Sequence, residues 1–210
     1  MRDSSEHARL NEAKWNRRAE TFDQRRFDFF RFFQWRVISL LDLTQVATFL
    51  DIGCGTGWAV RRVAYLLGTE GRAHGIDISP GMIERARAAS TGIGNVAFHV
   101  ANSEKLPFED GAFDCIICTL SFHHYFHPSR VLDEVSRVLK PRGRVHIMEL
   151  TADTLFMKLV DARSRRKEPE HVKFYSSREF KTLLESAGMR YVGFQRVWFP
   201  LKVHSAEKMP

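Results

Sequence analysis

Three glycines follow directly after a short apolar run and stand just before a stretch with helical spacing of apolar residues. At Gly53, Gly55 and Gly57 the backbone can pass close to a ligand, because glycine has no Cβ to block the approach. The helix that follows offers free amide groups and partial positive charge at its N-terminus. This pattern of strand, loop and helix predicts a site for an anionic or polar ligand.

A carboxylate stands where such a site needs one. Asp77 closes the next strand-like run, 72–78, twenty positions after Gly57. In Rossmann-like folds an acid at this place binds the ribose hydroxyls of a nucleotide. The alternative is that Asp77 caps the helix expected to begin near Pro80. The loop and the acid together predict a nucleoside-containing cofactor.

Two residues beside the loop favour S-adenosylmethionine over NAD. A dinucleotide fold needs Gly or Ala where this chain has Trp58, whose indole is too bulky for close approach of a pyrophosphate. Asp51, directly before the loop, would repel a pyrophosphate and stabilise an ammonium or sulfonium group. A P-loop is excluded because no Gly-Lys-Ser or Gly-Lys-Thr follows.

Strand-like and helical runs alternate over about a hundred residues around these positions. The strand-like runs are 47–52, 72–78, 96–100, 113–120 and 144–150, and the helical runs are 60–67, 81–89 and 129–139. This alternation predicts an α/β fold with a doubly wound, mostly parallel sheet. Beyond it we expect a helix capped by Ser176 or Ser177 and stopped by Gly188, then two antiparallel strands, 191–199 and 202–206.

The chain divides into two parts. Residues 1–46 have helical spacing and are expected to form an N-terminal extension that acts as a lid, and 47–210 form the cofactor-binding domain. Within the domain, 151–172 are expected to be a helical insertion over the site.

Composition restricts the class of protein. The 210 residues are 44% hydrophobic, which suits one core, and no apolar run approaches the length of a membrane span. Residues 1–6 are polar and lack a signal-peptide core, so we expect a cytoplasmic protein. The formal charge of +7 is spread along the chain and identifies no anionic partner.

The three cysteines predict no disulfide framework, because their number is odd and each lies in or beside an apolar run. Cys115 and Cys118 match a CxxC spacing, but positions three apart on a strand point to opposite faces. No metal or redox site is therefore expected.

Five segments resemble class I methyltransferases, and within them the branch of the ubiquinone and menaquinone C-methyltransferases. They are 50–57, 75–79, 102–108, 113–124 and 137–141. The resemblance implies a Rossmann-like, mostly parallel sheet of seven strands with a C-terminal antiparallel hairpin. It also implies S-adenosylmethionine as the cofactor, held by residues that include Asp51, Gly53, Gly55, Gly57, Asp77, Ile78, Met82, Asn102, Ser103 and Thr119.

Each matching segment carries a role by resemblance. The glycine loop would cradle the amino-acid part of the cofactor, and Asp77 would hold the ribose. Ile78 and Met82 would pack near the adenine, and Asn102 stands where the family usually has Asp. Arg142 stands where the family's turn often has Gly, so we expect an altered backbone there or a φ below zero.

His123 and His124 follow the strand whose end, in the family, faces the reactive methyl group. A phenol, enol or carbon acid needs a general base, and histidine suits that role near neutral pH. We expect one of the two side chains to point inward. The alternative is that both only shape the pocket. The expected acceptor is a small molecule, hydrophobic or aromatic.

The N-terminal segment also suits a lipid surface, because aromatic and arginine residues alternate along it. They are Phe22, Arg25, Arg26, Phe27, Phe29, Phe30, Arg31, Phe32, Phe33, Trp35 and Arg36. We favour instead a wall of the acceptor pocket. A lipid amine N-methyltransferase and a non-catalytic cofactor-binding module stay open as alternatives. Nucleic acid is not an expected substrate, because the chain has no recognisable RNA-binding module. The sequence leaves the oligomeric state open.

Overall fold

The computed structural model describes residues 3–25 and 27–210, and for residues 23–25 and 27–29 it describes the backbone but not the side chains. The strands are β1 (Thr48–Ile52), β2 (Arg72–Asp77), β3 (Val96–Val100), β4 (Phe113–Thr119), β5 (Leu139–Leu150), β6 (Met189–Trp198) and β7 (Leu201–Lys208). The helices are α1 (Ser4–Arg25), α2 (Phe27–Ile38), α3 (Trp58–Leu67), α4 (Pro80–Ala88), α5 (Pro128–Val138), α6 (Leu155–Lys167) and α7 (Ser177–Ser186). A 3₁₀ turn spans Phe122–His124.

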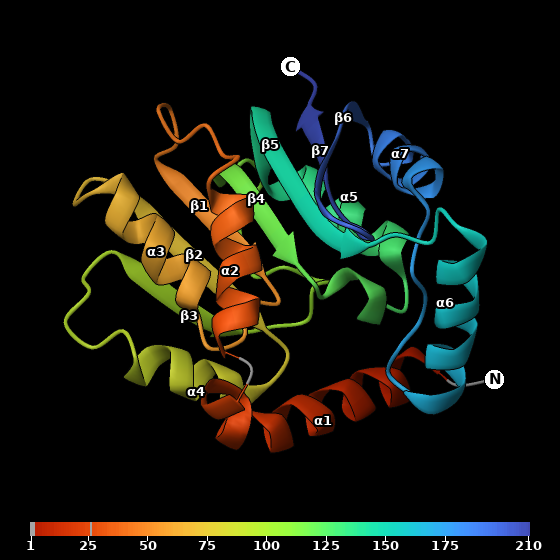
Figure 1. Ribbon diagram of the computed structural model, residues 1–210. Coiled ribbons are helices and arrows are strands. Elements are labelled where there is room, and N and C mark those ends of the chain that lie inside the picture. The colour runs from red at the N-terminus through yellow and green to blue at the C-terminus, as the bar shows by residue number, and fades with distance from the viewer. Residues whose placement is uncertain (1–2, 26) are drawn as a thin grey trace.

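Within the described residues, one seven-stranded sheet runs in the order β3-β2-β1-β4-β5-β7-β6. Strands β1 to β5 pair in parallel, and β7 is antiparallel to both β5 and β6. The strand order reverses between β1 and β4, which is where doubly wound sheets open a crevice for ligands. Figure 1 shows α1 lying across the end of the sheet at which β4 and β5 finish. The predicted Rossmann-like sheet with its C-terminal antiparallel hairpin is confirmed.

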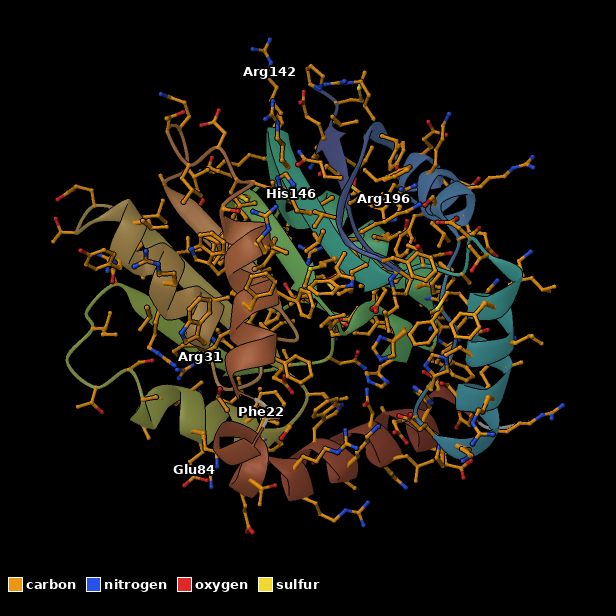
Figure 2. The ribbon with its side chains drawn as sticks, in the orientation of Figure 1. Phe22, Arg31, Glu84, Arg142, His146 and Arg196 are labelled. Carbon is orange, nitrogen blue, oxygen red and sulfur yellow. The ribbon has the colours of Figure 1, made fainter. Side chains whose placement is uncertain are left out.

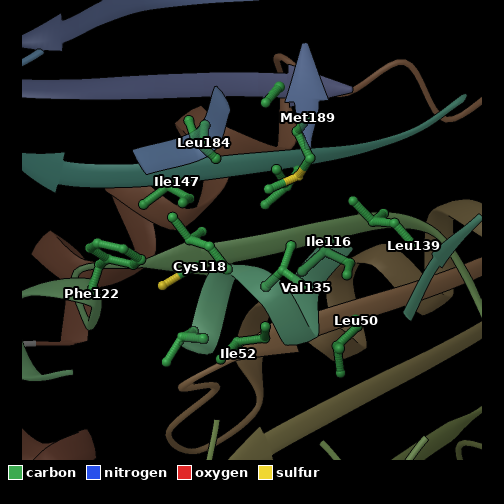
Figure 3. Close-up of a cluster of buried hydrophobic side chains, with 14 of the residues drawn as sticks. Leu50, Ile52, Ile116, Cys118, Phe122, Val135, Leu139, Ile147, Leu184 and Met189 are labelled. Atoms are coloured by element: carbon green, nitrogen blue, oxygen red, sulfur yellow. The ribbon is translucent and has the colours of Figure 1, made fainter. Parts of the chain in front are cut away.

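Two apolar layers cover the two faces of the sheet. One face packs against α5 and α7, and Figure 3 shows this cluster, in which Val135 of α5 and Leu184 of α7 lie against Ile116 and Ile147. The other face packs against α2, α3 and α4. Each layer buries the apolar stripe of its helices, which is the main source of stability in such a fold.

The two cysteines of the CxxC spacing take part in different layers. Cys118 belongs to the layer under α5 and α7, and Cys115 to the layer under α2, α3 and α4. Both thiols are buried and free, and burial raises their pKa values to about 12. The prediction that they point to opposite faces is confirmed.

The backbone at Arg142 differs from the expectation of a φ below zero. Its φ is +65°, in the left-handed region, and β5 begins before it, at Leu139. The pairing register shifts here, since Phe113 pairs with Leu139 and Cys115 with Arg144. Figure 2 shows the Arg142 side chain pointing away from the sheet into solvent. Because nothing crowds the exposed side chain, the residue can adopt a conformation that costs about 1 kcal/mol.

The two ends of α7, the helix before the C-terminal hairpin, are set by the residues that stand there. The Ser176 hydroxyl accepts a hydrogen bond from the Glu179 amide, and the Glu179 carboxylate accepts one from the Ser176 amide. This capping box satisfies two otherwise free amides at the start of α7. Gly188 follows with a φ of +75° and ends the helix, as expected.

The N-terminal residues form two helices with different roles. Phe33 and Val37 of α2 are buried in the same layer as Phe49 of β1. In contrast, α1 packs along α4 through Asn16, whose Oδ1 accepts hydrogen bonds from the Ser79 hydroxyl at 2.6 Å and the Gly81 amide at 3.0 Å. This pair of bonds holds α1 beside the carboxyl end of β2.

Candidate functional site

A cavity lies at the carboxyl ends of the central parallel strands, under α1 and α2. Its walls come from the glycine loop, from the ends of β2 and β4, and from both N-terminal helices. The lining residues used below are His7, Asn11, Trp15, Phe22, Phe30, Gly53, Gly55, Trp58, Asp77, Ile78, Asn102, Ser103, Glu104, Thr119, Ser121, His124, Tyr125 and Phe126. The site therefore combines segments from the first residues of the chain to residue 126.

The glycine loop has a backbone conformation that glycine adopts more readily than other residues. Gly53, Gly55 and Gly57 all have φ between 53° and 76°. A Cβ at Gly53 would lie 2.5 Å from the Ser121 hydroxyl, and one at Gly57 would lie 2.5 Å from the Phe98 ring. Close approach therefore requires glycine at both positions, for strand packing as well as for ligand access.

The Asp77 carboxylate is held by the loop and faces the cavity. Its Oδ2 accepts a hydrogen bond from the Gly55 amide and its Oδ1 one from the Ser79 amide, both at 2.9 Å. The α4 helix is capped by Ser79, whose hydroxyl accepts from the Met82 amide. The alternative that Asp77 caps this helix is therefore wrong. The lone pairs that remain on its carboxylate could accept hydroxyl groups of a sugar.

Asp51 is a fully buried acid without a hydrogen-bond partner among the described residues. Burial, and after it the nearby Asp77 charge, raise its pKa to about 8. The Thr119 hydroxyl, at the end of the neighbouring strand β4, also lacks a partner among the described residues. Thr119 lines the cavity, whereas Asp51 and Gly57 lie outside its lining. A buried acid on the strand beside a free hydroxyl suits a ligand group that carries N–H donors and positive charge, such as the ammonium of an amino acid.

The residues expected at the adenine are only partly brought together. Ile78, Asn102 and Ser103 line the cavity, and the Asn102 Oδ1 already accepts the Glu104 amide at 2.9 Å. Met82 is buried in α4 and does not line the cavity. Trp58 lines the cavity where a dinucleotide fold would need a small residue.

The two histidines after β4 point in different directions. His123 Nδ1 lies 2.8 Å from the fully buried carboxylate of Glu149, outside the cavity lining. His124 lines the cavity, and its Nδ1 lies 2.9 Å from the Glu170 carbonyl oxygen. Burial, with a smaller effect of His123, holds the pKa of His124 well below its usual value, so its ring is neutral near pH 7.

A stripe of α1 contacts His124 and lines the cavity beside it. His7, Asn11 and Trp15 are spaced four apart and so share one face of the helix. His7 Nε2 donates to the His124 carbonyl at 2.8 Å, and the Trp15 ring packs edge-on against the imidazole at 5.7 Å. Asn11 lies between them, and its buried Oδ1 has no partner among the described residues. Our sequence reasoning missed these three residues, although their spacing and polarity on an apolar face could have indicated them.

The segment 151–172 contacts residues that line the site, and it lies outside the cavity itself. None of these residues lines the cavity in the described structure. Instead, Glu168 and Glu170 form ion pairs with Lys14 of α1, and His171 bonds the buried Asp161 of α6 at 2.8 Å. The segment therefore holds α1 and His124 in place.

The aromatic residues of the N-terminal helices divide between cavity and surface. Phe22 and Phe30 line the cavity, and Figure 2 shows Phe22 near the junction of α1 and α2. Phe33 is buried, and Phe32 and Trp35 are exposed. The side chains of Arg25, Arg26, Phe27 and Phe29 lie outside the described residues.

Two further kinds of feature are absent from the described part of the chain. No helix there is both long and apolar enough to cross a membrane. No cluster of three His, Cys, Asp or Glu side chains there has the arrangement of a metal site.

A family model described as a methyltransferase domain matches residues 43–188. The bifunctional biotin biosynthesis protein BioHC of Teredinibacter turnerae is 34% identical over 166 residues, which are 75% of this chain and 29% of that protein. The ubiquinone/menaquinone C-methyltransferase UbiE of Pseudomonas fluorescens is 38% identical over 120 residues, 55% of this chain and 47% of that protein. The matched region thus spans less than half of each of these two relatives.

A solved structure shares the whole architecture. A SAM-dependent methyltransferase from Aquifex aeolicus superposes with a TM-score of 0.70 and 24% sequence identity, over 99% of both chains. At this identity the likeness concerns the fold.

Proposed function

This chain belongs to the class I S-adenosylmethionine-dependent methyltransferases, and on that premise we propose that it methylates a small, uncharged aromatic acceptor that carries a hydroxyl or enol group. The observation that carries the proposal is the imidazole of His124, buried, neutral and facing the cavity opposite an aromatic wall.

The glycine-loop half suits the cofactor S-adenosylmethionine. When bound, the cofactor supplies a methyl group on a sulfonium that is already a good leaving group. Asp77 would accept the ribose hydroxyls, and Ile78, Asn102 and Ser103 would surround the adenine. Asp51 and Thr119 would receive the cationic amino-acid end, which supplies the donors and the charge that these two buried groups lack.

The protonation state of His124 follows from its hydrogen bonds. A carbonyl oxygen can only accept, so the Glu170 carbonyl requires the proton of a neutral imidazole to sit on Nδ1. Nε2 then carries the lone pair, and it has no hydrogen-bond partner among the described residues. His124 could therefore take the proton of an acceptor hydroxyl at Nε2, which would make the acceptor oxygen or its conjugated carbon nucleophilic.

The α1 half of the cavity suits a flat, uncharged acceptor. Trp15, Phe22, Phe30 and Phe126 provide apolar ring surfaces, and Asn11 provides a second hydrogen-bond acceptor opposite His124. The lining carboxylates in the described structure are already engaged: Asp77 by loop amides, and Glu104 by His127 at 3.0 Å. With Asp77 committed to the ribose and Glu104 to His127, a cationic amine would find no uncommitted carboxylate beside the base, whereas a phenol or enol would find its proton acceptor.

Labelled S-adenosylmethionine tests the proposal. The purified chain is incubated with it and with a matched panel of phenols, enols, primary amines and phosphatidylethanolamine vesicles, and the products are separated. Label on the hydroxylated aromatic members supports the proposal. Label on amines or phosphatidylethanolamine alone would instead support a lipid amine methyltransferase. Calorimetric binding of S-adenosylhomocysteine without label on any acceptor, in the panel or in a host-cell extract, would indicate a cofactor-binding module.

A further inference from the structure

The outer face of α6 carries large apolar side chains that no part of the described chain covers. Leu155, Phe156 and Leu159 are 74%, 65% and 63% exposed. They occupy one side of the first two turns, because Leu155 and Phe156 lie four and three positions before Leu159, and both spacings bring side chains together on a helix. Single exposed apolar residues are ordinary, but three adjacent ones on one helix call for a partner.

The helix that displays them is firmly held, so the exposure does not reflect a loose segment. Thr154 caps α6 by accepting a hydrogen bond from the Met157 amide. On the inner side Met157 is buried with Phe174, and the buried Asp161 carboxylate accepts from His171 and from the Phe174 amide at 2.7 Å. These contacts fix which side of α6 faces outward.

The tip of the β6–β7 hairpin adds two aromatic rings at the same corner of the molecule. Trp198 and Phe199 are both more than half exposed. The next residue, Pro200, accepts hydrogen bonds at its carbonyl from the Thr151 amide and hydroxyl. Lys202 bonds Asp153 just before the helix, at 2.6 Å. The hairpin tip is therefore tied to the residues that lead into α6, which Figure 1 shows following β5.

Cations follow the apolar residues along the exposed side of α6. Lys158, Arg163, Arg166 and Lys167 are exposed and have no carboxylate partner among the described residues, whereas Arg165 pairs with Asp161 at 2.9 Å. Arg163 and Arg166 continue the stripe of Leu155 and Leu159, at spacings of four and three. We call these four cations, the three apolar residues of α6 and the two hairpin rings the α6 surface.

We propose that the α6 surface docks on an anionic lipid bilayer, with Leu155, Phe156, Leu159, Trp198 and Phe199 entering the interface and the four cations contacting lipid phosphates. Apolar side chains beside a cationic cluster, with a tryptophan at the edge, form the pattern of a helix that lies in a membrane surface. Each cation near such a surface adds about 1 kcal/mol of attraction. An acceptor that partitions into lipid would then reach the enzyme at its source.

Two other partners fit these observations less well. A second copy of this chain would bring two identical cationic clusters together, which like-charge repulsion opposes. A nucleic acid would match the cations but would leave the apolar side chains without apolar contact. The bilayer satisfies both the charge and the apolar surface.

Flotation of the intact chain with vesicles tests the proposal without reference to its methyltransferase activity. Vesicles of phosphatidylcholine with 30% phosphatidylglycerol, roughly the anionic content that gives such surfaces their potential, are compared with pure phosphatidylcholine. We expect the wild-type chain to float with the anionic vesicles and to be released by 0.5 M NaCl, a concentration that reduces the Debye length to about 4 Å. Recovery of the chain with neither kind of vesicle would overturn the proposal.

Three sets of substitutions separate the surfaces. The triple variant Leu155→Gln, Phe156→Gln and Leu159→Gln should lower the bound fraction at least about tenfold. A matched variant with Tyr65→Gln and Leu66→Gln removes exposed apolar residues from α3, and Phe32→Gln with Trp35→Gln does so on α2. Both should float like the wild type. Equal loss in the α2 variant and the triple variant would overturn the assignment to α6.

Two further measurements check that the variants are folded and that Trp198 enters the lipid. Circular dichroism should show all variants folded, since every substituted residue is exposed. Brominated lipids should quench the fluorescence of the wild-type chain on vesicles, and Trp198→Phe should remove most of that quenching. Unchanged quenching in Trp198→Phe, or displacement of the chain from vesicles into a complex with duplex RNA at equal phosphate concentration, would contradict the bilayer as the partner.

Discussion

The Nδ1 atom of His124 lies 2.9 Å from the carbonyl oxygen of Glu170, 46 positions further along the chain. This bond fixes which nitrogen of a neutral imidazole carries the proton, and it leaves the lone pair on Nε2. The adjacent His123 is bound through its own Nδ1 to Glu149. The two neighbours therefore have different roles: His124 lines the cavity, and His123 holds a buried carboxylate.

His124→Ala should lower kcat about 10²- to 10⁴-fold at unchanged affinity for S-adenosylhomocysteine, because it removes the proton acceptor but not the cofactor contacts. His123→Ala should keep most of kcat per folded molecule. It should lower the free energy of unfolding by about 1–3 kcal/mol instead, because the buried Glu149 carboxylate loses a hydrogen bond. Steady-state kinetics and urea unfolding measure both. If neither variant loses turnover, His124 is not the base.

Asp77→Ala should weaken the binding of S-adenosylhomocysteine by about 1–3 kcal/mol, since charge-assisted hydrogen bonds to the ribose are lost. It also removes the acceptor for the Gly55 and Ser79 amides. Asp77→Asn retains an acceptor oxygen and should fall between Ala and wild type. Titration calorimetry reports the affinities, and an Ala variant that binds as tightly as wild type would refute the role assigned to Asp77.

Asp51 should make the ligand-free protein less stable as the pH rises. Its pKa is about 8 when folded and near its ordinary value of 3.8 when unfolded. Between these values the folded state binds more protons than the unfolded state, so the free energy of unfolding falls with increasing pH. From pH 5.5 to 7.5 we expect Asp51→Asn to gain about 1–3 kcal/mol relative to wild type. Urea unfolding at both pH values measures this difference, which must be absent if Asp51 is already ionised at pH 5.5.

Gly57→Ala should destabilise the chain more than Gly188→Ala. Both glycines have a φ of +75°, so both variants incur about 1 kcal/mol of backbone strain. Only at Gly57 does the new Cβ also meet the Phe98 ring, at 2.5 Å, whereas nothing lies within 4 Å at Gly188. We expect an additional loss of about 1–3 kcal/mol at Gly57 from overpacking. Thermal or urea unfolding of the two variants measures this difference, and equal losses of stability would show that the glycine loop relaxes.

Local patterns in the sequence were sufficient for several structural features. The alternation of strands and helices predicted the sheet, because burial of an apolar face requires a period of two in strands and 3.6 in helices. The side-chain alternation along β4 placed Cys115 and Cys118 on opposite faces. At Arg142 the alternative of a φ below zero was wrong, because an exposed side chain tolerates a positive φ that the residue type alone does not reveal.

Only one part of the cavity, the glycine loop with Asp77, could be predicted from the sequence. Gly53, Gly55 and Asp77 belong to one strand-loop-helix-strand unit, so their proximity follows from spacing along the chain. Asn11 and Trp15 reach the same cavity only because Asn16 bonds Ser79 and Lys14 pairs with Glu168. Contacts between segments so far apart in sequence depend on the packing of complete helices, and no local pattern encodes them.

The sequence by itself determined the order of the elements, the glycine loop and the carboxylate that follows it, because each depends on residue type within a few positions. The tertiary structure decided which histidine faces the cavity, which groups on α1 meet it and which side of α6 is left uncovered. Those outcomes depend on which faces of the helices are buried when the whole chain packs, and burial is a property of the assembled fold.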